Sequence, residues 1–372
     1  MNKRYLIALL VLMLLSSIPS LSLGGSWNGW IYQNPYPTSN TLLAVKFVTP
    51  KKGWMAGEHG TILYTEDGGD TWEAQESGIE RDIRSLSFVN ERAGWMVGNR
   101  GVIIHTKDGG KTWEKQGDVR ESLYTVFFVN EKEGWAGGDG GILLRTGDGG
   151  KQWLNRDIGT GASIASIFFL NPKTGWVLAG GQVYRTTDGG KNWNVSSLPS
   201  VKMPGPGRFT KREEAFIETV PEHGWEGSVY FLNEKKGWAT IGIWYIFSTE
   251  DGGRTWQSGK VSDSVDRIAF TDEKNGCMAA SSIFCTEDGG QAWKERMGIA
   301  YNKKETVEGH IVSIWGLSFA DKSTGWAVGK KGQMWKTEDE GKSWKIKSGS
   351  RPFVYLWDSK TAWGKTSRNN IA

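Results

Sequence analysis

Short alternating or apolar runs, each separated from the next by clusters of Gly, Asn and Asp, recur along the chain. One unit shows the pattern, in which Ser85–Val89, Gly94–Gly98, Gly101–Thr106 and Thr112–Gln116 each have the length of a strand. Runs of this kind between turn residues predict β-strands that pair in sequence order. Each unit therefore predicts four antiparallel strands, and the fold class is all-β.

A second regularity gives the period of the repeat. The motif Thr-x-Asp-Gly-Gly-x-Thr-Trp recurs seven times with small variations, mostly about 40 residues apart. Its aspartates are Asp67, Asp108, Asp148, Asp188, Asp251, Asp288 and Asp339. A Gly-Trp pair precedes six of the motifs, and Gly276-Cys277 stands in its place in the sixth repeat. Four strands in each such repeat predict a β-propeller of four-stranded blades.

The motif itself is best explained as a structural turn between the third and fourth strands. Its Asp and first Thr can hydrogen-bond to the turn backbone, its glycines can adopt positive φ, and its Trp can bury an indole. Catalytic or calcium-binding aspartates are the alternative. Seven near-equivalent copies argue against one active site, and one carboxylate per turn supplies too few oxygen ligands for Ca²⁺. The repeated tryptophans are likewise expected between the blades rather than in a carbohydrate-stacking surface.

The ends of the chain decide how many blades the ring contains. Residues Trp30–Gln33 resemble a lone fourth strand, and Phe353–Gly364 resembles the first two strands of a further repeat without its Asp turn. If these ends pair within the ring, they make a composite eighth blade. If the C-terminal segment only folds back, the propeller has seven blades, which is the number we expect.

The N-terminus has the features of a signal peptide. Lys3 and Arg4 precede an apolar run from Tyr5 to Leu15, and small residues follow up to Gly24. Eleven residues are too few to span a bilayer of about 30 Å, although an uncleaved anchor helix is the alternative. We predict a signal peptide over residues 1–24 and a single propeller domain over residues 25–372. The protein is then exported to the periplasm, the thylakoid lumen or the medium, with no further transmembrane span.

The charge and the titratable residues narrow the function. Without Lys3 and Arg4 the chain carries 43 basic and 41 acidic residues, interleaved through every repeat. This balance excludes the concentrated basic surface that nucleic-acid binding needs. The four histidines lack metal-ligand spacing, and no Gly-Gly pair lies in a phosphate-loop context. We therefore expect a monomer with no cofactor, no metal and no catalytic residue.

Two insertions interrupt the regular spacing. The first covers about residues 195–226 and includes a short predicted helix from Lys211 to Thr219, and the second covers about residues 294–310. Loops often carry function, so both are candidate recognition elements. The alternative is that both are surface insertions that the fold tolerates.

Cys277 and Cys285 are the only cysteines. Both lie in the sixth repeat, on the predicted second and third strands, and a turn near Ser281 would place them opposite each other. In an oxidising compartment this arrangement permits a cross-strand disulfide. The alternative is a pair of buried thiols, one of them in place of the repeat Trp.

The Gly-Trp pairs and the Thr-x-Asp-Gly-Gly-x-Thr-Trp motifs together resemble Asp-box repeats, also called BNR repeats. Their dense use in a chain with a signal peptide resembles the photosystem II stability and assembly factor family and its relatives in non-photosynthetic bacteria. This resemblance covers nearly all of the chain after residue 24. It implies a lumenal or periplasmic scaffold without catalysis, which binds a membrane-protein subunit through a basic patch on one face of the propeller.

Four arginines are candidates for such a patch. Arg81, Arg84, Arg120 and Arg267 lie just before or at the first strand of their repeats. Guanidinium groups in this position can receive carboxylates of a partner. Scattered surface arginines with no shared task are the alternative.

An enzyme is the competing function, because sialidases and other glycoside hydrolases also contain Asp-box repeats. A sialidase-like site would need an arginine triad, a Tyr with a Glu partner and an acidic Asp, and the Phe-Arg-Ile-Pro element that begins such chains is absent. Glu213 and Glu214 are adjacent on the predicted helix, a pattern typical of a solvated face. We therefore predict a non-catalytic protein-binding scaffold, with a carbohydrate-binding or carbohydrate-degrading propeller as the alternative.

Overall fold

The computed structural model describes residues 30–31, 37–117, 119–204, 216–218, 227–242, 245–261, 265–296, 314–348, 354–357 and 362–365. The chain forms two compact units, one over Tyr36–Ser350 and one in which Met1–Pro35 joins Arg351–Ala372. The predicted signal peptide over residues 1–24 lies outside the described residues. No helix within the described ranges is long and apolar enough to cross a membrane.

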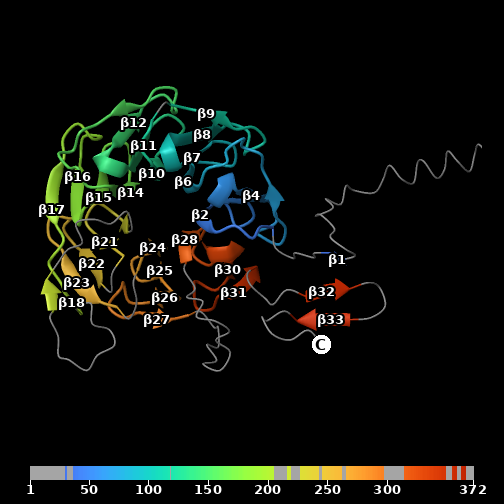
Figure 1. Cartoon of the computed structure of the whole chain (residues 1–372). Coiled ribbons are helices and arrows are strands. Elements are labelled where there is room, and N and C mark those ends of the chain that lie inside the picture. The colour runs from blue at the N-terminus through green and yellow to red at the C-terminus, as the bar shows by residue number, and fades with distance from the viewer. Residues whose placement is uncertain are drawn as a thin grey trace, which may run out of the picture. The chain divides into compact units, whose positions relative to one another are not determined.

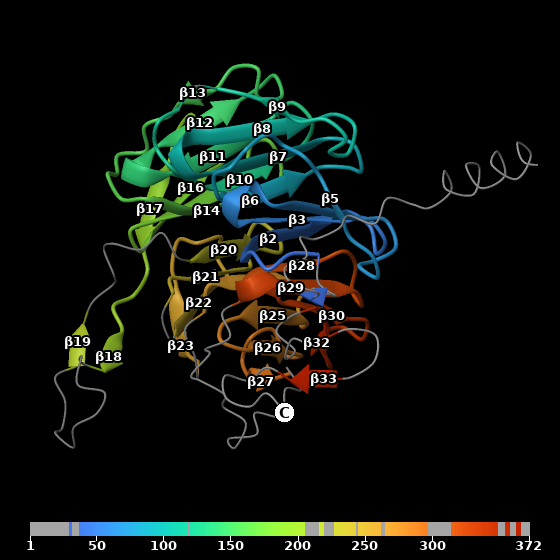
Figure 2. The same ribbon diagram turned by 45° about the vertical axis from the view of Figure 1, so that its right-hand side comes forward.

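The larger unit is a ring of seven four-stranded antiparallel sheets, which we number as blades 1–7 (Figures 1 and 2). Blade 1 contains β2 (Leu42–Phe47), β3 (Gly53–Gly57), β4 (Ile62–Thr65) and β5 (Glu73–Ala74), and blade 2 contains β6 (Ile83–Phe88), β7 (Gly94–Gly98), β8 (Val102–Thr106) and β9 (Glu114–Lys115). Blade 3 contains β10 (Leu123–Phe128), β11 (Gly134–Gly138), β12 (Leu143–Thr146) and β13 (Leu154–Asn155), and blade 4 contains β14 (Ile164–Phe169), β15 (Gly175–Ala179), β16 (Gln182–Thr186) and β17 (Asn194–Ser197). Blade 5 contains β20 (Ser228–Phe231), β21 (Gly237–Thr240), β22 (Tyr245–Thr249) and β23 (Gln257–Lys260). Blade 6 contains β24 (Arg267–Phe270), β25 (Gly276–Ala279), β26 (Ile283–Thr286) and β27 (Lys294–Glu295), and blade 7 contains β28 (Ile314–Phe319), β29 (Gly325–Gly329), β30 (Met334–Thr337) and β31 (Lys345–Ser348). The prediction of a seven-bladed all-β propeller is confirmed.

The ring closes between two complete blades. Phe47 of blade 1 stacks on Trp326 of blade 7, with ring centroids 3.4 Å apart. The termini do pair, because β1 (Trp30–Ile31) lies antiparallel to β32 (Val354–Trp357), which pairs with β33 (Ala362–Lys365). They form a three-stranded sheet of their own in the smaller unit, so the eight-blade alternative is wrong.

The first insertion contributes a hairpin. Its strands are β18 (Lys202–Pro204) and β19 (Phe216–Glu218), which pair with each other. The predicted helix from Lys211 to Thr219 is therefore wrong over the residues of β19. Phe and Ile favour strands, and the partner strand satisfies backbone hydrogen bonds that an isolated short helix would leave open. Most of the second insertion, from residue 297 to 313, lies outside the described residues.

A repeated aromatic stack joins one blade to the next. The Trp of each Gly-Trp pair lies flat on the Phe at the end of the first strand in the following blade, as Trp95 does on Phe128 with centroids 3.6 Å apart and an interplanar angle of 7°. The Trp of the next Asp box, Trp153, meets the edge of the same Phe ring at 89°. The equivalent indole lies on the next Phe at five other junctions. Each Phe thus contacts two indoles, and the six stacked tryptophans are at most 1% exposed.

The same stack explains the glycine of the Gly-Trp pair. A Cβ atom built on Gly134 would lie 2.5 Å from two atoms of the Phe128 ring, and one built on Gly53 would meet Phe47 at the same distance. Each Phe ring lies directly over this glycine, and only glycine leaves room for it. The pair is therefore a packing device: the glycine makes room for the Phe of its own blade, and the tryptophan covers the Phe of the next.

Blade 6 uses a disulfide where the other blades use an indole. Cys277 occupies the Trp position, is directly opposite Cys285 on the neighbouring strand, and is bonded to it with an S–S distance of 2.05 Å. Both sulfurs face Gly341 of the next Asp box, where an added Cβ would lie 2.6 and 3.0 Å from them. Phe319 of blade 7, which has no indole stacked on it, is only half-buried, whereas its six counterparts are buried.

This packing predicts that a methyl group at the glycine of the pair is destabilising. The Gly134→Ala variant should lose about 1–3 kcal/mol of unfolding free energy, because the new Cβ overlaps the ring of Phe128. Gly147→Ala is the matched control, since a Cβ there meets no atom within 4 Å. Denaturant unfolding measures both. Equal stability of the two variants would contradict the packing account.

Candidate functional site

The antiparallel meander gives the propeller two faces with different loops. In blade 1, the start of the first strand at Leu42 pairs with Gly57, and its end at Phe47 pairs with Gly53, which in turn pairs with Thr65. We call the first end the η face, because the 3₁₀ turns η1 (Glu58–Gly60), η2 (Asn99–Gly101), η3 (Asp139–Gly141) and η4 (Lys330–Gly332) lie there. We call the second end the box face, because it carries the Asp boxes.

The Asp boxes form closed hydrogen-bond networks. In blade 2, the hydroxyl of Thr106 donates to Asp108 Oδ1 at 2.8 Å and accepts the N–H of Gly110 at 2.7 Å. The carboxylate of Asp108 also accepts the backbone N–H of Thr112 at 2.9 Å and its hydroxyl at 2.6 Å. The bonds from the first Thr to Asp and from the second Gly to Thr recur in all seven boxes. The carboxylate oxygens of the box aspartates therefore accept hydrogen bonds from their own turns.

The hydrogen bonds also keep the box carboxylates ionised. The backbone N–H and the side-chain amide of Asn192 lower the pKa of Asp188 to about 2, against a smaller opposing effect of burial. Burial acts to raise the pKa of Asp108, but the hydroxyl and the backbone N–H of Thr112 outweigh it and lower that pKa to about 2. A carboxylate with such a low pKa is a poor proton donor at neutral pH.

The η face carries three of the four predicted arginines close together in blades 2 and 3. Arg81, in the loop before β6, donates through Nη1 to the backbone carbonyl of Arg100 at 3.3 Å. Arg84, on β6, donates through Nε to Asn99 Oδ1 at 3.0 Å, and its Nη2 lies 3.7 Å from Asp82 Oδ2. Arg120 is exposed in the loop before β10, two residues from Ser122. The hydroxyl of Ser122 accepts the backbone N–H of Arg100 at 3.2 Å, which joins the two blades.

The fourth predicted arginine lies elsewhere on the ring. Arg267 begins β24 in blade 6, and its Nη1 donates to the backbone carbonyl of Asp266 at 2.9 Å and to that of Gly227 at 3.4 Å. It is half-buried and holds main chain of its own blade and of the segment before blade 5. Its contacts therefore give it a structural role, apart from the blade 2 and 3 cluster.

A polar network continues from Arg84 along the inner strands. The phenol of Tyr124 on β10 donates to Asp139 Oδ1 at 2.5 Å, and Ser163 donates to the same oxygen at 3.4 Å. Burial and the hydrogen bond to the carboxylate raise the pKa of Tyr124 to about 12, while the charge of Arg84 opposes the shift. Tyr124 of blade 3 and Ser163, the residue before β14 of blade 4, thus meet at Asp139 of η3 on the η face.

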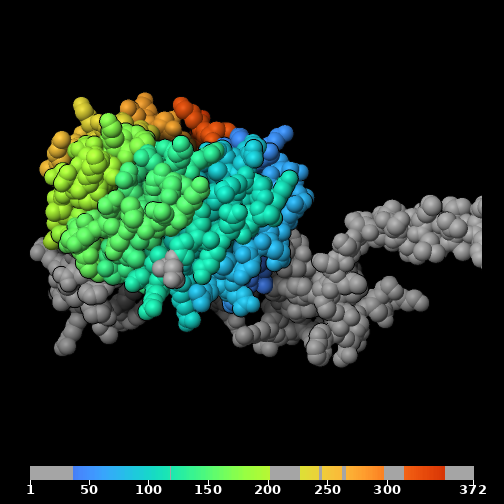
Figure 3. Space-filling view, turned by 90° about the horizontal axis from the view of Figure 1, so that it is seen from above, coloured from blue at the N-terminus to red at the C-terminus, as the bar shows by residue number. Residues whose placement is uncertain are grey.

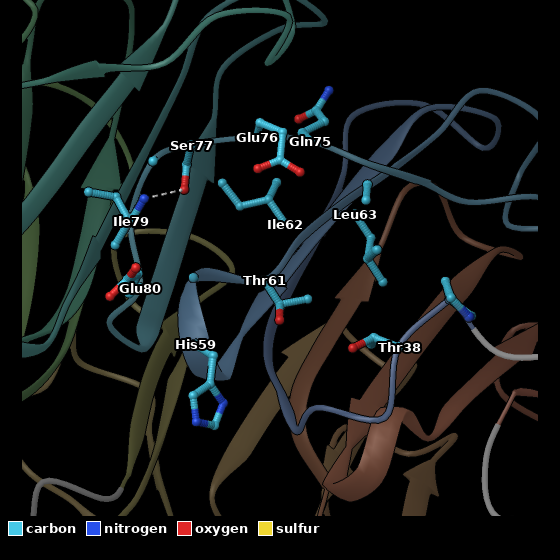
Figure 4. A pocket seen from close by; sticks show the side chains of 14 residues that line it. Thr38, His59, Thr61, Ile62, Leu63, Gln75, Glu76, Ser77, Ile79 and Glu80 are labelled. Carbon is cyan, nitrogen blue, oxygen red and sulfur yellow. Dashed lines mark hydrogen bonds between the residues drawn. The ribbon is translucent and has the colours of Figure 1, made fainter. Parts of the chain in front are cut away.

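Beside the arginines, the η face is hollowed at blade 1. An open cavity of about 460 Å³ lies between η1, the chain that leads into blade 1, and the loop from Gln75 to Glu80. Figure 4 shows Ser77, Ile79 and Glu80 on one side and Thr38 on the other, with Thr61 between them. The hydroxyl of Ser77 accepts the backbone N–H of Ile79 at 3.2 Å and so shapes this wall. Arg81 follows the wall directly in sequence.

Arg100 is a member of the cluster that the sequence analysis missed. It lies in η2 with φ of 54°, and His59 and Lys331 occupy the same left-handed position in η1 and η4. Basic side chains therefore project from the η turns of three consecutive blades, namely 7, 1 and 2. The sequence does contain a signal for these residues. A basic residue comes directly before the last glycine in the turns Gly-Glu-His-Gly, Gly-Asn-Arg-Gly and Gly-Lys-Lys-Gly.

Comparison with protein families gives one match over most of the chain. The family model described as photosynthesis system II assembly factor YCF48 matches residues 26–120, 115–234 and 260–351. Two curated relatives match over shorter segments. The photosystem II stability/assembly factor HCF136 of Cyanidioschyzon merolae is 37% identical over 62 residues, which are 16% of this chain and 13% of the relative. The assembly protein Ycf48 of a Synechococcus species is 36% identical over 78 residues, 20% of this chain and 22% of the relative. Each alignment spans less than a quarter of the relative's length.

Solved structures share the propeller over most of its length. A structure of YCF48 bound to a D1 peptide has a TM-score of 0.61 at 20% sequence identity, and the match covers 86% of this chain and 99% of that one. An ancestral GH74 enzyme also has a TM-score of 0.61, at 13% identity, over 89% of this chain and 50% of the enzyme. At these identities the likeness shows the fold alone.

The low pKa of the box aspartates predicts a loss of stability in acid. The pKa of Asp188 is about 2 in the folded chain and about 3.9 in an unfolded one, so folding favours the ionised form. Its stabilising contribution is complete above about pH 4 and is lost as the pH falls from there through 2. The unfolding free energy of Asp188→Asn should therefore depend less on pH in this window than that of the wild type. Parallel pH profiles in urea unfolding would contradict the assignment.

Proposed function

Because the chain belongs to the photosynthesis system II assembly factor YCF48 family, we propose that it is an exported, non-catalytic scaffold that binds a segment of a membrane-complex subunit on its η face. One observation carries the proposal: Arg81, Arg84, Arg100 and Arg120 gather on this face beside a polar cavity. Their chemistry suits a partner segment that carries carboxylates, since guanidinium groups bind carboxylates in a planar, two-pronged arrangement.

The arginines of this cluster have N–H donors that can bind a partner. Arg100 and Arg120 are exposed, and Arg81 makes its hydrogen bond with a neutral backbone carbonyl. Within the part of the chain that the structure describes, Arg84 is the one arginine of the four with a side-chain ion pair, at the long distance of 3.7 Å from Asp82 Oδ2. A partner carboxylate would therefore meet guanidinium groups already positioned by backbone and amide oxygens. The YCF48 structure with a D1 peptide is a related propeller that holds a peptide, which supports a peptide-like partner here.

The titration of the acidic residues supports a non-catalytic role. A glycoside hydrolase needs one carboxyl group with a raised pKa to act as its acid. Among the described residues, each carboxyl group whose pKa departs from the usual range has it lowered. The carbohydrate-binding or carbohydrate-degrading alternative has support from fold likeness to GH74 enzymes only.

The remaining features of the proposal follow the family. We propose export through the N-terminal signal over residues 1–24 and work at the lumenal or periplasmic side of the membrane, as a monomer. Photosystem II is the partner complex that the family description names. In an organism without photosystems, the same face would serve another membrane complex.

The test is capture of a partner from membranes of the source organism, with mass spectrometry of the retained proteins. The wild-type protein should retain a photosystem II reaction-centre subunit or another membrane-complex subunit. Replacing Arg81, Arg84 and Arg100 by Ala should reduce its capture at least about tenfold, because charge-assisted hydrogen bonds to the partner are lost.

The matched control is Arg92→Ala, because Arg92 is exposed on the box face. This variant should capture the subunit as the wild type does. Equal capture by the triple variant would refute the η-face site. Retention on a glycan array without any membrane-protein capture would instead favour the carbohydrate-binding alternative.

A further inference from the structure

One position of the repeat connects four of the seven blades to the Asp box of the next blade. It lies three residues after the box Trp, and we call it the bridging position. Its occupants are Gln75, Gln116, Arg156, Ser196, Gly259, Arg296 and Lys347. From blade 1, the amide of Gln75 donates to Gly109 O at 2.9 Å, and from blade 2 the amide of Gln116 donates to Gly149 O at 3.1 Å. Ser196 of blade 4 makes the same kind of bond to Gly253 O at 2.5 Å.

Two of the charged occupants have a carboxylate partner. Lys347 of blade 7 lies 3.0 Å from Oδ1 of Asp70, the residue that follows Gly-Gly in the box of blade 1. Arg296 of blade 6 lies 2.7 Å from Glu287 of its own blade. The box residue opposite Arg296 is Lys342, which has its own partner in Glu340 at 3.1 Å. Each cation at these junctions is therefore neutralised locally.

At the junction of blades 3 and 4, by contrast, the cations have no such carboxylate partners among the described residues. Arg156 occupies the bridging position, and Lys191 occupies the box position that Asp70 has in blade 1. Glycines stand where the neutralising carboxylates would be, because Gly147 corresponds to Glu287 and Gly189 corresponds to Glu340. Within the described residues, neither the Arg156 guanidinium nor the Lys191 ammonium has a hydrogen bond or an ion pair.

An open cavity of about 440 Å³ lies at this junction. Arg156, Lys191 and Arg145 line it, together with Asn155, Asp157 and the backbone of Gly189 and Gly190. Figure 3 shows the two blades, coloured in neighbouring greens, side by side at the molecular surface. The cavity thus presents two guanidinium groups and one ammonium group against a single carboxylate.

The third cation is held in place by packing and also has a spare donor. The Arg145 side chain is 25% exposed, its guanidinium carbon lies 5.8 Å from the ring centroid of Trp135, and its Nη2 lies 3.5 Å from Glu133 Oε1. Its Nε is buried and has no hydrogen-bond partner among the described residues. The carboxylate of Asp157 accepts the backbone N–H of Gly159 at 2.8 Å.

We propose that the cavity between blades 3 and 4 is a binding site for an oxyanion group, held by Arg145, Arg156 and Lys191. The like charges of Arg156 and Lys191 repel each other. An anion bound between them would replace this repulsion by a charge-assisted hydrogen bond to each side chain. The cavity is in the size range of ligand sites, so the anion is a carboxylate or a phosphate carried on a larger molecule. The site includes the Asp box of blade 4, away from the η face, and does not depend on the function proposed above.

Calorimetric titration of the purified protein at low ionic strength tests the site, with pyrophosphate and citrate as probes. At least one of these anions should bind to the wild type and raise its melting temperature, because a ligand that binds only the folded state stabilises it. Stronger binding of pyrophosphate identifies a phosphate-bearing ligand. Binding of citrate equal to or stronger than that of pyrophosphate identifies a carboxylate-bearing one.

Two variants introduce at this junction the residues that occupy the equivalent positions at other junctions of the ring. Arg156→Gln installs the residue that blades 1 and 2 carry, and it should lower the affinity at least about tenfold. Lys191→Asp reproduces the Lys347–Asp70 arrangement, so it should abolish binding and raise the melting temperature without any anion. Lys151→Asp is the matched control, since Lys151 occupies the same box position in blade 3 opposite the neutral Gln116. Its affinity should stay within about twofold of the wild type.

The design separates this site from general attraction of anions to the protein. A similar loss of affinity in the Lys151→Asp control and in the two site variants would overturn the proposal. Unchanged affinity in Arg156→Gln and Lys191→Asp would do the same. Failure of both anions to bind the wild type would also refute it, whatever the result of the capture experiment on the η face.

Discussion

The stack of an indole on the phenylalanine of the next blade is the contact on which the rest of this structure depends. It joins consecutive four-stranded sheets at six of the seven junctions, and it includes the contact between Trp326 and Phe47 that closes the ring. Its geometry requires a glycine beneath the Phe ring and a box Trp at its edge. At the remaining junction the disulfide of Cys277 and Cys285 takes the place of the indole. Most of the repeated residues are therefore explained by packing.

Because the repeated residues serve packing, a binding function has to come from other residues. The box aspartates accept several hydrogen bonds each and stay ionised, so they are unsuited to proton transfer. Recognition is left to residues that differ between repeats. In our proposals these are the arginines of blades 2 and 3 and the basic residues of the η turns on the η face, and Arg156 and Lys191 at the junction of blades 3 and 4.

The sequence predicted the propeller, its blade number and the turn character of the Asp box, because each rests on a pattern that is repeated seven times. Sequence-based prediction was wrong or incomplete for features that occur only once in the chain. The segment Phe216–Glu218 lies within the predicted helix from Lys211 to Thr219 but gains a strand partner in Lys202–Pro204, which no local pattern reveals. Arg100 was missed because its left-handed turn had to be known first. Arg267 was grouped with the other arginines by repeat position, yet its blade and its backbone acceptors set it apart. That the Arg156 side chain has no partner among the described residues became visible only when each junction could be compared with the others.

Site-specific photo-crosslinking in native membranes tests the central claim most directly, that a membrane-complex subunit binds on the η face. One photoreactive side chain would replace Glu121, which is exposed next to Arg120 on the η face, and another would replace Lys132, which is exposed on the box face. The account predicts a crosslink to a membrane-complex subunit from position 121 and none to that subunit from position 132. A crosslink to the same subunit from position 132 alone would contradict it.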